Sequence, residues 1–338
     1  MNAAPIVFFL ALCLAAPPAA AVTADSFARM PEVRAFIGEM QEKHGFDRAE
    51  LARDFASTQP IAAVIKAVLP APEPGVRSWA AYRARFVEAR RINMGLRFWQ
   101  QYRTQLTAAR ERFGVPEEII VAIIGIESIY GRNPGHFNTF AALSTLAFDY
   151  PPPALTGTPP RSALFRDELE QLLLLARETH RDPLSYTGSY AGALGLPQFL
   201  PSSVRRYAVD AEHNGRIDLA ASATDAIASI ANFLSLHGWQ KDAPVAVAAT
   251  VAGNAYTRLL DQGIAPSHTP AEMAAFGVVS PGAPEQPAAL IDLVTPQQPT
   301  EYRLGYRNFY VLTRYNRSSF YAMAVYDLAR ALRAARDQ

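Results

Sequence analysis

The chain has 338 residues, of which 50% are hydrophobic and 19% are charged, and its formal net charge is +1. This is the composition of a folded globular protein with room for two or three lobes and a sizeable core. A balance so close to neutrality excludes a strongly basic surface for nucleic acid and gives little steering toward an anionic polymer, so binding has to depend on a cleft.

The first 24 residues have the composition of a secretory signal peptide. Residues 6–16 form an apolar run that is too short to span a membrane, and small residues follow it up to Ala24. No Lys or Arg precedes this run. Cys13 raises the alternative of a lipoprotein anchor, but Leu12 is larger than the residue usual before a lipidated cysteine. We therefore expect a protein that is soluble in the periplasm after cleavage, without disulfides or thiolate metal sites.

Residues 25–112 are predicted to form an N-terminal helical domain. Asp47 with Glu50 matches the capping box that begins a helix, and Gly45 suits the end of the helix before it. Apolar spacing and Pro-rich composition further predict a helix at 61–68, a linker at 70–75 and one amphipathic helix at 91–112.

A helix that is apolar on all sides is predicted to begin at Pro116 and to end before Gly131. Glu117 and Glu118 complement its positive end, and the Ile and Val residues that follow leave no polar face, so the helix belongs in the core. Glu127 lies near its C-terminal end, where burial and the helix dipole both disfavour the charged form. A carboxyl group with a raised pKa suits a general acid at neutral pH. The alternative is a buried carboxylate held by a structural arginine.

Beyond this helix the pattern stays helical to about residue 243, after which Pro- and Gly-rich turns separate short strands. The expected elements are helices at 138–148, 162–179 and 225–237, a Pro-rich loop at 151–160, strands at 245–247, 289–293 and 309–312, and a closing helix at 319–336. The expected segments are a core at 113–243 that carries Glu127, a small β-containing lobe at 244–315, and a C-terminal helix at 316–338.

Three blocks of sequence, in order along the chain, carry a family signature. Residues 125–132 read GIESIYGR, residues 188–203 read GSYAGALGLPQFLPSS, and residues 313–316 and 321–325 read TRYN and YAMAV. These blocks resemble the signatures of the membrane-bound lytic murein transglycosylase B family, over nearly the whole mature chain. The resemblance implies a mainly α (α+β) fold, in which a lysozyme-like catalytic core is joined by a helical domain built from both chain ends and by a small β lobe.

The resemblance also implies a reaction. The family cleaves the β-1,4 bond between N-acetylmuramic acid and N-acetylglucosamine in peptidoglycan and forms 1,6-anhydro-N-acetylmuramic acid. Glycoside cleavage usually takes two carboxylates, but the three blocks hold only Glu127. Elsewhere, Asp182 better fits a turn and Asp149 a helix-end hydrogen bond. We therefore expect Glu127 to act first as acid and then as base, with help from the 2-acetamido group of the substrate.

Two other functions remain open at this point. A hydrolytic muramidase on the same fold would need a base for water, such as Asp149 opposite Glu127. A catalytically inactive cell-wall binding protein would have no use for an acid on an apolar helix. The expected partners are peptidoglycan glycan strands, together with other cell-wall enzymes, and no nucleic acid is expected.

The resemblance further implies substrate-binding residues around Glu127. Ser189 would hydrogen-bond near Glu127, and Gln198 would contact a sugar, although the glycines of their block could instead form a tight loop on the core. Aromatic faces suit sugar rings, but tyrosines are also common core residues. The remaining implied cleft residues are Tyr315, Asn316, Tyr82 and Tyr321.

Residues 210–218 resemble the first part of an EF-hand loop, with oxygen ligands at positions one, three, five and nine and Gly215 at position six. The family can carry a calcium loop here. This chain departs from it at position twelve, where Ala221 stands in place of a bidentate acid. No cofactor is required, but the loop could hold calcium as a structural ion; the alternative is a metal-free turn with an acid in the first turn of the next helix. The candidate ligands are Asp210, Glu212, Asn214, the carbonyl of Arg216, and Asp225.

Overall fold

The structure is a computed structural model that describes residues 27–69, 77–152 and 161–338. The predicted signal peptide with Cys13, the linker at 70–75 and most of the Pro-rich loop at 151–160 lie outside the described residues. Within them, no helix has both the length and the apolar character needed to cross a membrane.

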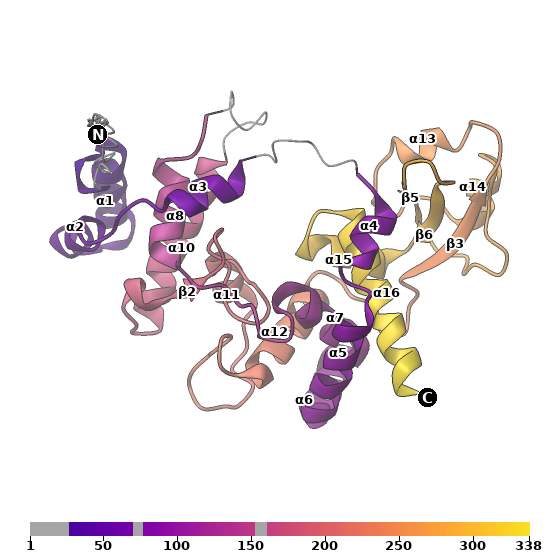
Figure 1. Ribbon diagram of the computed structural model, residues 1–338, viewed down its shortest axis with the longest axis horizontal. Helices are drawn as coiled ribbons and strands as arrows, with labels where there is room; N and C mark the ends of the chain where they lie inside the picture. The colour runs from indigo at the N-terminus through magenta and orange to yellow at the C-terminus, as the bar shows by residue number, and fades with distance from the viewer. Residues whose placement is uncertain (1–26, 70–76, 153–160) are drawn as a thin grey trace, which may run out of the picture.

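The first helices lie at one end of the elongated molecule (Figure 1). They are η1 (Phe27–Arg29), α1 (Pro31–His44), α2 (Arg48–Ala56) and α3 (Ala62–Val68). Gly45 ends α1 in the left-handed conformation, and the Asp47 side chain accepts the backbone N–H of Glu50 at the start of α2, so the predicted boundary is confirmed. Phe36 and Phe55 both pack against Phe148 of the next lobe, which attaches this end to the core.

The next three helices lie elsewhere in the molecule (Figure 1), and the first two of them contact the C-terminal helix. They are α4 (Trp79–Ala84), α5 (Ala89–Gln101) and α6 (Arg103–Phe113). The single helix predicted at 91–112 is wrong, because Tyr102 leaves the helical conformation at φ −109° and ψ 28°. Both helices contact α7, and the break lets α5 also contact α16 while α6 also contacts α12. The helices of residues 25–112 thus do not pack as one group among the described residues, and the lobe boundaries stay predictions.

The predicted apolar helix is α7 (Glu117–Ser128), and its residues from Ile119 to Gly125 are all buried. It contacts α5, α6, α12 and α16, so it is surrounded by helices as its sequence requires.

The rest of the core is built from α8 (Thr139–Phe148), α10 (Ser162–Glu178), α11 (Pro201–Tyr207) and α12 (Ala223–Leu236). The short strands β1 (Phe137–Asn138) and β2 (Thr187–Gly188) pair antiparallel, with Phe137 opposite Gly188, and η2 (Pro183–Ser185) precedes β2. Gly135 lies against the Gly188 carbonyl where a Cβ would collide with backbone, so this approach requires glycine.

The β lobe is an antiparallel sheet with strand order β4-β3-β6-β5. Its strands are β3 (Ala246–Val251), β4 (Val278–Val279), β5 (Ala289–Leu293) and β6 (Glu301–Gly305), and it also holds α13 (Thr257–Leu260) and α14 (Pro270–Ala274).

The strand predicted at 309–312 is wrong, because these residues belong to α15 (Arg307–Tyr315). Four apolar residues in a row fit either element, and the helix buries Phe309, Val311 and Leu312 against the core. The sequence also did not indicate β1, β2, β4 and β6. The longest of these is β6, which lies between β3 and β5 although it carries the polar residues Glu301 and Arg303.

The closing helix α16 (Ser319–Arg336) has the predicted bounds, with Ser318 as its N-cap. It runs beside α4, α5 and α7 (Figure 1), so the end of the chain is packed on helices from its first half. This packing brings the first turn of α16 to the C-terminal end of α7, where Glu127 lies. The elements together form a mainly helical fold, as predicted, with one four-stranded sheet and one two-stranded sheet.

Candidate active site

Glu127 is the centre of the candidate site. The hydroxyl of Tyr321 donates a hydrogen bond of 2.6 Å to its Oε1. Burial raises the pKa of Glu127 to about 7, and the Tyr321 hydrogen bond acts in the opposite direction. In the described part of the chain no arginine or lysine contributes to this shift, so the alternative of a structural arginine partner has no support. At neutral pH a carboxyl group with this pKa is protonated in a large fraction of the molecules, and a general acid has to be protonated to donate.

The chain leaves α7 through two successive left-handed residues. Ile129 has φ 52° and ψ 50°, and Tyr130 has φ 57°. The backbone N–H of both donates to the carbonyl of Ile124, and the Ser128 hydroxyl accepts the N–H of Gly131 over 3.1 Å. A left-handed conformation costs roughly 1–2 kcal/mol per non-glycine residue, and strain of this kind is concentrated at functional sites.

Three of the predicted tyrosines gather around Glu127. The Tyr321 ring is 2% exposed and lies nearly parallel to the Tyr315 ring, with centroids 6.3 Å apart. Burial and then the charge of Glu127 raise the pKa of both Tyr321 and Tyr315 well above its usual range. The same two causes raise the pKa of Tyr82, which packs on the ring of Phe320. The structure therefore brings together residues from α4, α7, α15 and α16.

The glycine-rich block is attached to this group through Tyr315, whose hydroxyl donates to the carbonyl of Pro197 over 2.6 Å. Ser189 was expected to hydrogen-bond near Glu127, but the hydrogen bonds of its side chain are within its own block. The Ser189 hydroxyl accepts the N–H groups of Ala191 and Ala193 and so closes its own turn.

The two other predicted cleft residues are placed differently from one another. The Gln198 side chain donates to the carbonyls of Pro134 and Gly195, each over 2.8 Å, so its amide nitrogen holds the block in place. Asn316 ends α15 and is exposed beside Tyr315.

Neither of the other candidate carboxylates perturbs Glu127 among the described residues. Asp182 accepts the N–H of Leu184 over 2.8 Å, as expected of a turn residue. Asp149 is exposed at the end of α8, directly after Phe148, which packs against Phe36 and Phe55 near the N-terminal end of the molecule.

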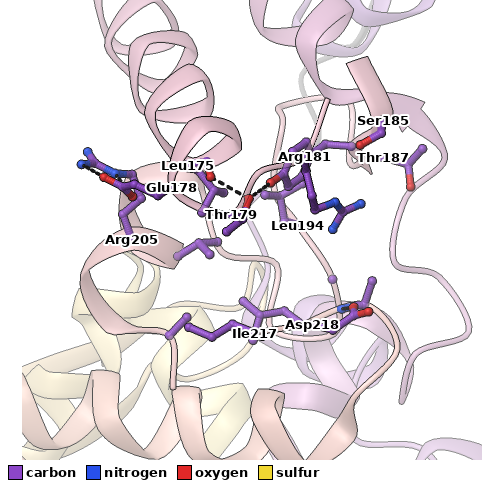
Figure 2. Close-up of a pocket in the computed structure, with 16 residues that line it drawn as sticks. Leu175, Glu178, Thr179, Arg181, Ser185, Thr187, Leu194, Arg205, Ile217 and Asp218 are labelled. Atoms are coloured by element: carbon purple, nitrogen blue, oxygen red, sulfur yellow. Dashed lines mark hydrogen bonds and ion pairs between the residues drawn. The ribbon is translucent and has the colours of Figure 1, made fainter. Parts of the chain in front are cut away.

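A cavity of about 260 Å³ lies on another side of the glycine-rich block (Figure 2). Leu194 of the block, Leu175 of α10 and Ile217 line it, and the ion pair between Glu178 and Arg205 lies at one side. Glu127 is not among its lining residues, so this cavity is separate from the candidate catalytic group.

The predicted calcium loop fits the ion only in part. Asp210 accepts the N–H groups of Asn214 and Gly215. Asp225, which is 1% exposed in the first turn of α12, uses both carboxylate oxygens to accept the N–H groups of Ala211 and Asp218. Across the described ranges, no group of three His, Cys, Asp or Glu side chains is arranged to hold a metal ion.

Two residues near Glu127 were not singled out by the sequence analysis. The Arg91 guanidinium of α5 donates to the carbonyl of Gly125 in α7. Gly95, also in α5, lies directly against the hydroxyl of Tyr130. The available signal was the glycine itself, because a glycine inside an amphipathic helix indicates close packing when its helix is otherwise regular.

Residues 28–330 match the family model described as the transglycosylase SLT domain. The chain is 39% identical over 324 residues to the membrane-bound lytic murein transglycosylase B of Escherichia coli (strain K12), an alignment that covers 92% of this chain and 85% of that protein.

Solved structures agree in fold. The soluble lytic transglycosylase SltB1 from Pseudomonas aeruginosa has a TM-score of 0.82 at 41% identity, over 91% of this chain and 100% of that chain. Escherichia coli Slt35 in complex with calcium has a TM-score of 0.77 at 37% identity, over 92% and 96%. Pseudomonas aeruginosa SltB3 in complex with NAG-anhNAM-pentapeptide has a TM-score of 0.75 at 28% identity, over 89% and 79%. The fold is therefore the lysozyme-like fold of these enzymes.

Proposed function

This chain belongs to the transglycosylase SLT domain family, and we propose that it is a peptidoglycan lytic transglycosylase in which Glu127 is the only catalytic carboxylate. The substrate is the β-1,4 bond between N-acetylmuramic acid and N-acetylglucosamine, and the product is 1,6-anhydro-N-acetylmuramic acid. The observation that carries the proposal is a carboxyl group whose pKa burial raises to about 7, with a tyrosine as its hydrogen-bond partner.

In the first step the neutral Glu127 carboxyl gives its proton to the glycosidic oxygen as the bond from that oxygen to C1 breaks. The leaving N-acetylglucosamine keeps this oxygen as its 4-hydroxyl group. The 2-acetamido group of N-acetylmuramic acid stabilises the positive charge that develops at C1. The carboxylate formed on Glu127 still accepts the hydrogen bond of Tyr321, which stabilises its charge.

In the second step the Glu127 carboxylate takes the proton of the C6 hydroxyl. The oxygen of that hydroxyl bonds to C1 and closes the 1,6-anhydro ring, and Glu127 returns to its neutral form. No water enters, so one carboxylate serves as acid and then as base. A hydrolase would need a second group to activate water, and no other carboxylate perturbs Glu127 in the described residues.

The substrate-binding residues are proposed from their places around Glu127. Tyr82, Tyr315 and Tyr321 supply aromatic faces or hydroxyls within reach of its charge. The exposed amide of Asn316 is available to a sugar, whereas Gln198 and Ser189 shape the glycine-rich block. The partners are glycan strands and other cell-wall enzymes in the periplasm, with no cofactor required.

Mass spectrometry of the products tests the reaction. Purified mature protein is incubated with peptidoglycan sacculi, with Glu127→Gln as the control. Muropeptides that are lighter than the hydrolysed species by one water and end in 1,6-anhydro-N-acetylmuramic acid are expected. Reducing-end products would instead mean hydrolysis and would return attention to Asp149. No products from folded protein would favour the inactive binding protein.

A further inference from the structure

We propose that Tyr130 is a positioning residue for Glu127, held in a slot between three helices. The slot is the space between Gly95 of α5, Gly125 of α7 and Leu332 of α16, and we call it the Tyr130 slot. The proposal rests on the proposed function, because it takes Glu127 as the group that transfers the proton.

The Tyr130 slot exists only because two of its walls lack side chains. A Cβ at Gly125 would lie 2.5 Å from the Tyr130 hydroxyl oxygen and 2.6 Å from the ring carbon that carries it. A Cβ at Gly95 would also lie closer to this oxygen than the 3.0 Å that real Cβ atoms respect. The α5, α7 and α16 helices contact one another and run side by side (Figure 1). The Tyr130 ring therefore fits between helix backbones, at a place where alanine is too large.

The insertion of Tyr130 fixes the chain on both sides of Glu127. Before Glu127, Arg91 donates to the Gly125 carbonyl and ties α7 to α5. After it, the chain takes the left-handed conformation at Ile129 and Tyr130 that turns the ring back toward α7. Glu127 lies between these two fixed points. The carboxyl group of Glu127 must reach the glycosidic oxygen and then the C6 hydroxyl. A small change in its direction therefore lowers the rate of both proton transfers.

Tyr130 positions Glu127 through the packing of its ring and not through a hydrogen bond of its hydroxyl. Among the described residues its hydroxyl oxygen is buried and has no hydrogen-bond partner. Its ring packs on Phe98, with centroids 5.7 Å apart. Phenylalanine would keep the ring in the slot and remove only the unpaired hydroxyl, whereas alanine would empty the slot.

The test compares Tyr130→Phe with Tyr130→Ala in the full-length mature enzyme. Tyr130→Phe is expected to keep kcat, KM and the pH profile of the parent. Tyr130→Ala is expected to lower kcat by about 100-fold with little change in KM, since misplacing a reacting group costs this much. It is also expected to move the high-pH limb of kcat to lower pH, because water that enters the slot weakens the burial of Glu127.

A second set of variants keeps the proposal testable if Tyr130→Ala fails to fold. Gly95→Ala alone is expected to lower kcat. The double variant Gly95→Ala with Tyr130→Phe is expected to recover most of it, because the clashing hydroxyl is gone and the nearest remaining atom, a Leu332 methyl carbon at 2.6 Å, is the end of a flexible side chain that can shift. Gly125→Ala is the matched control that Tyr130→Phe does not rescue, since its Cβ would still meet the ring carbon at 2.6 Å. Melting temperatures and circular dichroism show which variants are folded.

The outcomes separate this inference from the proposed function. A folded Tyr130→Ala variant with the kcat and pH profile of the parent would overturn the role of Tyr130, while an inactive Glu127→Gln variant would leave the proposed function standing. Equal losses in the Gly95→Ala single and double variants would also contradict it. Turnover in Glu127→Gln would remove the proposed function itself.

Discussion

The hydroxyl of Tyr321 lies 2.6 Å from Oε1 of Glu127, although the two residues are 194 positions apart in the chain. The contact depends on the packing of α16 on α7, since Tyr321 lies in the first turn of α16 and Glu127 in the last turn of α7. Burial raises the pKa of Glu127, and the hydrogen bond from Tyr321 lowers it, because that bond stabilises the charged form. The closing helix thus helps to set the protonation state of the candidate acid.

Glu127→Gln is expected to abolish cleavage and to leave the fold and glycan binding intact. The amide keeps the shape of the carboxyl but cannot transfer a proton, and loss of acid–base catalysis costs about 10²–10⁴-fold per role. Turnover of sacculi, circular dichroism and sedimentation with insoluble peptidoglycan measure the three properties. Glu118→Gln is the matched control on the same helix, because Glu118 pairs with Arg333 and lies away from Glu127. Retained turnover in Glu127→Gln would exclude its assigned role.

The pH profile of kcat is expected to fall as pH rises above about 7, since the first step needs Glu127 in its neutral form and its pKa is about 7. Initial rates on soluble glycan fragments across pH 5 to 9, taken roughly every half unit, would show this limb. A profile that stays flat to about pH 9 would contradict a proton donor of this pKa.

The free energy of unfolding should also depend on the protonation of Glu127. The pKa of Glu127 rises from 4.5 to about 7 on folding, so the folded state holds its proton more tightly. The resulting stabilisation is complete below about pH 4.5 and is lost as pH rises through about 7. Its size is on the order of 2 kcal/mol after allowance for partial exposure of the side chain. Urea unfolding at two pH values should therefore show a smaller loss between acid and mildly alkaline pH in Glu127→Gln than in the parent, and equal losses would contradict this.

Tyr321→Phe is expected to move the high-pH limb of kcat upward. Removing the hydroxyl removes the interaction that lowers the pKa of Glu127, while the buried ring remains. The value of kcat should also fall by roughly 10- to 100-fold, because the carboxylate formed in the first step loses a hydrogen bond worth about 1.5–3 kcal/mol. Tyr326→Phe is a suitable control on the same helix. A limb that stays in place would show that Tyr321 does not tune Glu127.

The elements that were predictable from sequence are those whose signals are local. The α16 helix has a serine cap and regular apolar spacing, and its bounds were predicted to the residue. The break at Tyr102 was not predictable, and neither were the strand at 301–305 and the helix that replaces the strand predicted at 309–312. All of these depend on packing. Both α5 and α6 contact α7, but α5 also packs on α16 and α6 on α12. The β6 strand lies between β3 and β5 although it carries charged residues.

The residues of the candidate site also differ in whether a local sequence signal predicts them. Glu127 could be found from its own helix, since an acid at the end of an apolar segment is a local signal. The partners of Ser189 could not, because the turn of the glycine-rich block brings the Ala191 and Ala193 N–H groups to its hydroxyl. The Tyr130 slot depends on three helices that meet only in the fold.

Calcium is expected to leave the melting temperature of the parent almost unchanged. Position twelve of the loop is Ala221, and Asp225 already accepts two backbone N–H groups with its carboxylate. A site with ion present at 100 times its Kd would stabilise the native state by about 2.7 kcal/mol, which is a shift of several degrees. Thermal unfolding with millimolar calcium and with chelator distinguishes the two cases. Ala221→Glu supplies the missing ligand and is expected to create a calcium-dependent shift, which Asp210→Asn should then remove. A shift of several degrees in the parent would instead establish the structural ion.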